Sequence, residues 1–170
     1  ELQGETPLAT AALHRLLLAV LHRNFGPDSP SAWARLWEAG RWDEDQIRAY
    51  LGRWHDRFDL FDDCYPFYQT AETDITRESL TRLSLTHAFY STLFEHQAAG
   101  DSFAISPARA AQWVVTMQAS GIGMGPPHHP HPARPLINSL LVMVQGDNLF
   151  ETLALNMLQY APDRDRPIPG

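Results

Sequence analysis

The chain has no lysine, only one cysteine and no long apolar run. All thirteen basic residues are arginine, and against twenty acidic residues they leave a formal net charge of −7. An acidic chain binds nucleic acid poorly through general attraction, because nonspecific affinity comes from neutralised phosphates. Any contact with nucleic acid must therefore be local and set by shape. The single Cys64 excludes an internal disulfide and indicates a reducing compartment, and we expect its side chain to be small, buried and inert.

The absence of apolar segments of about 18 residues or more argues against a membrane span, and no signal-peptide pattern is visible. What the chain does contain is typical of a globular protein. Its 170 residues are 44% hydrophobic and rich in aromatic side chains, which suffices for one domain with a core. Because it starts at Glu1 and ends in a polar, proline-rich tail over 161–170, we expect a piece of a longer protein.

Apolar side chains recur at helical spacing in several segments that have clear start signals. Good capping residues precede the main segments, namely Thr6, Ser29, Asp43, Ser106 and Asn148. Gln46 and Glu151 stand where they would complete capping boxes. We expect helices over residues 8–24, 30–40, 43–55, 107–121 and 148–158, with a weaker one over 76–85.

Two of these helices have a well-defined apolar stripe, formed by Ile47, Tyr50, Leu51 and Trp54 in one and by Ala110, Trp113, Val114 and Met117 in the other. The apolar run 136–145 predicts a strand, and residues 87–96 form a loop or a strand. The expected fold is therefore α+β, predominantly helical with a small sheet.

A glycine-rich stretch, Gly121-Ile122-Gly123-Met124-Gly125, connects the fourth strong helix to the apolar run. Three glycines at alternate positions remove Cβ atoms and free the backbone to adopt positive φ. Such a loop can lie against a phosphate or the edge of a groove. It can equally well be a simple turn between two core elements, since short glycine motifs match by chance.

Two clusters of polar side chains invite a chemical interpretation. His128, His129 and His131 could bind Zn²⁺, but Pro130 and Pro132 stiffen their loop and no fourth ligand is evident, so we expect no metal. The three aspartates of the aromatic segment 58–68, Asp59, Asp62 and Asp63, are more typical of a solvated turn. Known catalytic motifs are absent, so we expect no enzyme and no cofactor.

Taken together, the segments resemble the CasA family, the large subunit of the type I-E CRISPR surveillance complex Cascade. The matching motifs follow one another in the family's order over almost the whole chain. They lie in residues 16–23, 33–40, 50–61, 66–70, 93–96 with 106–119, and 146–156.

The resemblance implies that residues 1–160 are a partial amino-terminal domain. The family's carboxy-terminal four-helix bundle and first strands are absent, and residues 161–170 are a tail. It also implies a non-catalytic, cytoplasmic subunit that recognises the protospacer-adjacent motif (PAM) in duplex DNA and helps to load the target. The implied partners are the other Cascade subunits, CRISPR RNA, double-stranded target DNA and a recruited helicase-nuclease.

Residue by residue, the family's PAM-binding glycine loop corresponds to Gly121, Ile122, Gly123, Met124 and Gly125. The resemblance also implies that Phe89, Tyr90, Leu93 and Phe94 contact the guide RNA or a neighbouring subunit. Many relatives have Gly-Asn-Asn where this chain has Ala88-Phe89-Tyr90, and an aromatic pair there could stack on bases. Two other classes remain open, a protein-protein interaction scaffold with a structural glycine loop and a metal-dependent hydrolase using the histidines.

Overall fold

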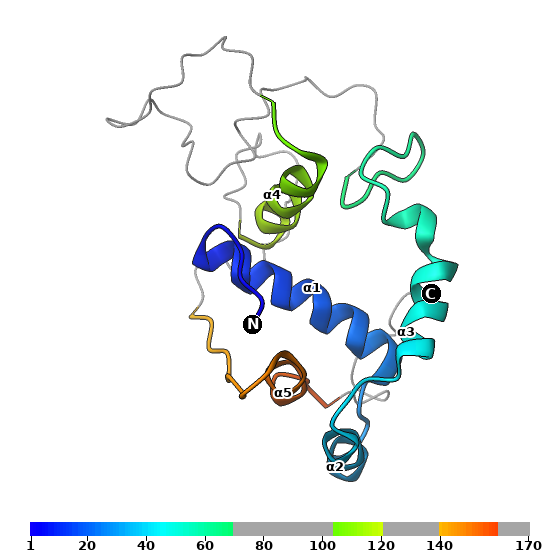
Figure 1. Ribbon diagram of the computed structural model, residues 1–170, viewed down its shortest axis with the longest axis vertical. Coiled ribbons are helices and arrows are strands. Elements are labelled where there is room, and N and C mark those ends of the chain that lie inside the picture. The colour runs from blue at the N-terminus through cyan, green and yellow to red at the C-terminus, as the bar shows by residue number, and fades with distance from the viewer. Residues whose placement is uncertain (70–103, 121–139, 160–170) are drawn as a thin grey trace, which may run out of the picture.

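The computed structural model describes residues 1–69, 104–120 and 140–159 of the chain (Figure 1). Within these ranges the regular elements are helical and no strand occurs. This confirms the helical part of the expected fold, whereas the small sheet is not seen in the part described. The elements are α1 (Pro7–Phe25), α2 (Pro30–Ala39), α3 (Glu44–Arg53), the 3-10 turn η1 (His55–Arg57), α4 (Pro107–Ser120) and α5 (Leu149–Leu155).

The helices begin where the sequence predicted, because polar side chains satisfy their first backbone amides. The hydroxyl of Thr6 accepts from the amide of Ala9, and that of Ser29 from the amide of Ala32. At the end of α2, Gly40 adopts a left-handed conformation with φ 62°, which a residue without a Cβ takes at no steric cost. The starts of α1 and α2 and the end of α2 are therefore set by local chemistry.

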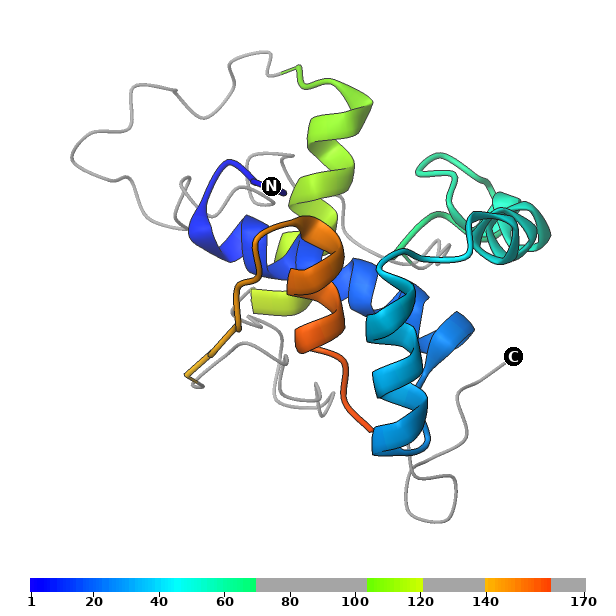
Figure 2. The ribbon, with the colours of Figure 1, turned by 60° about the horizontal axis from the view of Figure 1, so that its bottom comes forward.

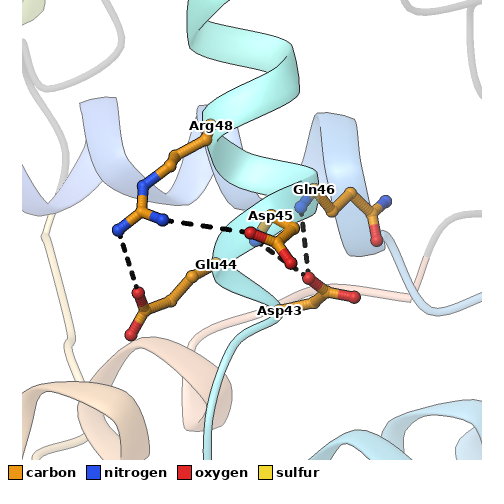
Figure 3. A network of polar contacts seen from close by, with 5 residues as sticks. All are labelled: Asp43, Glu44, Asp45, Gln46 and Arg48. Carbon is orange, nitrogen blue, oxygen red and sulfur yellow. Dashed lines mark hydrogen bonds and ion pairs between the residues drawn. The ribbon is translucent and has the colours of Figure 1, made fainter.

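A cluster of charged residues marks the start of α3 (Figure 3). Asp43 Oδ1 accepts from the amides of Asp45 and Gln46 at 3.0 and 3.1 Å. Arg48 lies 3.3 Å from Glu44 and 3.9 Å from Asp45, but these side chains are exposed and such pairs stabilise a helix only weakly. The side-chain nitrogen of Gln46 donates to the carbonyl of Asn24 at 2.6 Å, which joins α3 to the end of α1. Asp43 therefore caps α3, whereas the Gln46 side chain bonds Asn24 and does not complete the predicted capping box.

The long helix α1 lies at the centre, with α4 and α5 packed on different sides of it (Figures 1 and 2). Ala12 of α1 packs against Val115 and Ala119 of α4. On the other side, Leu21 packs against Leu153 and Met157. None of the helices in the described ranges is long and apolar enough to cross a membrane.

Aromatic rings connect the shorter helices to this core. Phe150 of α5 lies between Trp37 and Trp42, with ring centroids 6.3 and 5.0 Å away. Trp33 stacks on Trp37 at 5.4 Å, and its indole nitrogen donates to the carbonyl of Ala154 at 2.8 Å. Because this hydrogen bond joins residues far apart in the sequence, it fixes α2 against α5.

Several predictions from the sequence are wrong in detail. Residues 140–145, expected to belong to a strand, form no strand, and Leu140 and Val142 are 89% and 76% exposed. Leu51, placed on the inward stripe of its helix, is exposed, as is Cys64, which we expected to be buried. Helix α5 ends at Leu155 rather than near Leu158, because the amide of the C-cap residue Asn156 turns back to bond the last carbonyls.

Candidate nucleic-acid interface

The glycine loop, Gly121, Ile122, Gly123, Met124 and Gly125, lies outside the described residues. So do Phe89, Tyr90, Leu93 and Phe94, the three histidines at 128, 129 and 131, and the tail 161–170. Helix α4 is described up to Ser120, the residue directly before the loop. The described part of the candidate interface is therefore α4, the helix that leads into the loop, together with its contacts.

The second half of helix α4 is held by a buried face. Trp113 and Val114, predicted to face the core, are each 7% exposed, and Val115 and Ala119 are also buried. Ser106 caps the helix, since its hydroxyl accepts from the amide of Arg109 at 3.3 Å. Because α4 is closely packed to within one turn of its end, the position of Ser120, the residue before the loop, is fixed by the core.

A carboxylate that the sequence did not single out secures the same helix. Glu5 Oε1 lies 2.7 Å from Arg109 Nε, and Glu5 Oε2 accepts from the indole nitrogen of Trp113 at 3.1 Å. The guanidinium of Arg109 also lies over the Trp113 ring, 5.1 Å from its centroid. Glu5 directly precedes the cap of α1, so one side chain ties the start of α1 to the first half of α4. Nothing in the local pattern around Glu5 signals this role.

The last turn of α4 carries a second tie. The side-chain nitrogen of Gln118 donates to the carbonyl oxygen of Tyr68 at 3.1 Å. Ser120 and Thr116 each donate their hydroxyl to a carbonyl one turn earlier in α4, at 2.8 and 2.7 Å. The polar side chains that precede the loop thus bond to backbone carbonyls, and the Gln118 bond joins the helix end to the segment around Tyr68.

Two of the three aspartates of the aromatic segment, Asp59 and Asp62, form turns, as predicted. Asp59 Oδ1 accepts from the amide of Phe61 at 2.8 Å, and Asp62 Oδ1 accepts from the amides of Tyr65 and Cys64 at 2.6 and 2.9 Å. Hydrogen bonds from Tyr65 and then Cys64 lower the pKa of the Asp62 carboxyl, because they favour its charged form. Among the residues described, no group of His, Cys, Asp or Glu side chains is arranged to hold a metal.

The sequence matches a known family over nearly its full length. The model of the family CRISPR-associated protein Cse1 matches residues 1–168. A curated relative from Thermus thermophilus, CRISPR-associated protein CasA/Cse1, is 37% identical over 180 residues. That match covers 98% of this chain and 35% of the relative, so the chain spans about a third of the relative's length.

Solved structures of the same family share the fold. The structure of Thermus thermophilus CasA (Cse1) matches with a TM-score of 0.74 at 34% identity, over 98% of this chain and 34% of that one. Thermobifida fusca Cse1 matches with a TM-score of 0.73 at 34% identity, over 96% and 33% of the two chains. The chain therefore belongs to the Cse1 family of CRISPR-associated proteins.

Proposed function

We propose that this chain is the amino-terminal part of the large subunit of a type I-E Cascade complex, with residues 1–160 forming a partial domain and 161–170 a tail. In this proposal the subunit is non-catalytic and cytoplasmic. It recognises the PAM in duplex DNA, helps to load the target and supports recruitment of the helicase-nuclease. The other Cascade subunits and CRISPR RNA are its partners, and Phe89, Tyr90, Leu93 and Phe94 contact one of them.

The observation that carries the proposal is the anchoring of α4 directly before the glycine loop. The helix is buried at Ala119 and tied to Tyr68 through Gln118. A loop that enters the minor groove, which is about 6 Å wide, must offer positions without a Cβ where its backbone approaches the groove, and it must be held at its base. Gly121, Gly123 and Gly125 meet the first requirement in the sequence, and α4 meets the second. Shape-based recognition also suits a chain with a net charge of −7.

The test is Gly123→Val in the full-length subunit, assembled with its partners and guide. A branched side chain should collide with the walls of the minor groove, so binding of PAM-bearing duplex should be lost. Binding of the same target offered as a single strand should persist, because guide pairing reads that sequence. Gel shifts with both substrates measure the two outcomes.

A matched control is Gly52→Val in α3, where an added Cβ meets nothing within 4 Å. This variant should bind both substrates as the wild type does. If Gly123→Val unfolds the subunit, backbone strain rather than a groove clash explains the loss, and a melting curve separates the two causes. If Gly123→Val binds both substrates normally, the loop is a turn, and the alternative of a protein-protein interaction scaffold replaces the DNA-binding role.

A further inference from the structure

The segment that follows η1, residues 58–69, folds into a loop that reaches the end of α4 (Figure 1). The segment doubles back on itself, since the backbone amide of Phe67 donates to the carbonyl of Asp59 at 2.8 Å. The side-chain nitrogen of Gln69 also donates to the carbonyl of Leu60, at 3.0 Å. These bonds join the two ends of the segment, so it has a defined shape although it contains no helix or strand.

Two neighbouring residues attach this segment to the second half of α4. The side-chain nitrogen of Gln118 donates to the carbonyl oxygen of Tyr68 at 3.1 Å. Phe67, the residue before Tyr68, packs against the core cluster to which α4 contributes Val115 and Ala119. The segment therefore contacts α4 through a hydrogen bond and through apolar packing, and both contacts lie close to the end of the helix from which the glycine loop follows.

The acceptor of this hydrogen bond lies on an unusual backbone. Tyr68 has φ 58°, a left-handed conformation that is unfavourable for a residue with a Cβ and that persists only where the surrounding structure holds it. A return of Tyr68 to negative φ would rotate its carbonyl group and move the oxygen away from Gln118. The bond can therefore be broken from either end, by removing the donor or by disfavouring the conformation of the acceptor.

We propose that Gln118 and Tyr68 are positioning residues for PAM recognition, an inference that rests on the DNA-binding role proposed above for residues 121–125. Gln118 belongs to the last turn before Gly121, so its bond to Tyr68 restrains the base of the loop. A binding element that is held in place before its ligand arrives loses less conformational freedom on binding. Loss of the bond should therefore weaken binding of PAM-bearing duplex. Pairing of a single strand with the guide does not pass through this loop and should be unaffected.

The test uses the full-length subunit, assembled with its partners and guide, and three substrates. These are the PAM-bearing duplex, the same duplex with a scrambled PAM, and the target as a single strand. Gln118→Met removes the donor, keeps the size of the side chain and adds no charge. It should bind the PAM-bearing duplex about three- to tenfold more weakly, as expected for one lost hydrogen bond, and the other two substrates as the wild type does. Each purified complex must contain the subunit in equal amount, so that dissociation of the subunit cannot cause the difference.

Substitutions of Tyr68 test the same bond from its other end. Tyr68→Val disfavours positive φ, because a branched side chain raises the steric cost of that conformation, and it should weaken the PAM-bearing duplex as Gln118→Met does. The double variant should bind no more weakly than either single variant, since both changes remove one interaction. Tyr68→Asn tolerates positive φ and keeps the backbone carbonyl, so it should bind all three substrates as the wild type does.

Gln46→Met is the matched control, because Gln46 makes the same kind of bond, to the carbonyl of Asn24 at 2.6 Å, between α3 and the end of α1. It should bind all three substrates as the wild type does. The inference is overturned if Gln118→Met keeps wild-type affinity for the PAM-bearing duplex, if Tyr68→Asn loses that affinity, or if Gln46→Met lowers it equally. Additive losses in the double variant would also overturn it.

The variant Gly123→Val separates this inference from the proposed function on which it rests. If Gly123→Val loses the PAM-bearing duplex and Gln118→Met does not, the loop binds DNA and only the positioning role of Gln118 is wrong. If Gly123→Val binds that duplex normally, the DNA-binding role and the positioning role are both wrong.

Discussion

The side-chain amide of Gln118 donates to the carbonyl oxygen of Tyr68 across 3.1 Å, joining the last turn of α4 to a residue fifty positions earlier in the chain. Tyr68 is the one non-glycine residue with positive φ in the part of the chain that the structure describes. The bond therefore holds a backbone in the left-handed region and ties the segment around Tyr68 to the helix that precedes the proposed DNA-binding loop.

Replacing Gln118 with alanine should lower the free energy of unfolding by about 0.5–1.5 kcal/mol, the range for a lost hydrogen bond, and nearer the lower limit because the bond is exposed. Hydrogen exchange should quicken for the backbone amides of residues 67–69. Gln118→Glu is the control that keeps the size of the side chain but cannot donate, so it should behave like alanine. If Gln118→Glu exchanges as slowly as the wild type, donation to Tyr68 is not what orders this segment.

Trp113→Ala should destabilise the chain by about 3–5 kcal/mol, because Trp113 is only 7% exposed. Chemical denaturation measures the loss. Trp113→Phe keeps most of the apolar contact but gives up the hydrogen bond to Glu5, so it should cost much less. Equal losses for the two variants would mean that the bond to Glu5, rather than packing, dominates.

Local chemistry explains what the sequence could predict. Thr6, Ser29 and Asp43 cap helices through side chains that bond amides two or three residues away. The starts of these helices therefore depend only on residues that are close in the sequence. The helical stripe that contains Trp113 was predictable for the same reason. Its burial on one face of a helix follows from spacing alone.

Contacts between distant segments could not be predicted from the sequence. Neither could the conformation of residues 140–145, which form no strand. Glu5 and Trp113 are 108 residues apart, and no periodicity connects them. The run 140–145 has the composition of a strand, but a strand also needs a neighbour to bond its backbone, and sequence alone supplies none. The assignment of residues 121–125 to DNA binding rests on motif resemblance. The structure describes only the helix that precedes them, α4.

Acidification should destabilise the chain through His22. Burial lowers the pKa of this imidazole below 6.5, and its Nε2 accepts a hydrogen bond from the amide of Leu158 at 3.0 Å, which requires the neutral ring. The unfolded state then binds more protons, so stability is fully present above about pH 6.5 and is lost as the pH falls through the lower, folded pKa. Denaturant melts between about pH 7.5 and 5 measure this slope.

His22→Gln removes the titrating group while keeping a side chain that can accept from Leu158. Its stability should therefore vary less with pH over this window than that of the wild type. The lowered pKa of Asp62 acts in a more acidic range, near and below 3.8, and does not interfere. An unchanged slope in His22→Gln would assign the acid sensitivity to another group.

Asn156 is expected to hold the exposed apolar segment in place. Its side-chain amide pairs with both backbone groups of Val144, as the backbone of a neighbouring strand would. It donates to the Val144 carbonyl at 2.6 Å and accepts from the Val144 amide at 3.0 Å. The same nitrogen donates to the Thr152 carbonyl at 2.7 Å, which completes the end of α5. Asn156→Ala should cost about 1–3 kcal/mol and greatly speed hydrogen exchange at Val144, since its amide loses its partner. Asn156→Asp keeps the acceptor but loses both donations, so Val144 exchange should remain slow while stability falls. If exchange at Val144 is fast already in the wild type, the pairing with Asn156 does not restrain residues 140–144.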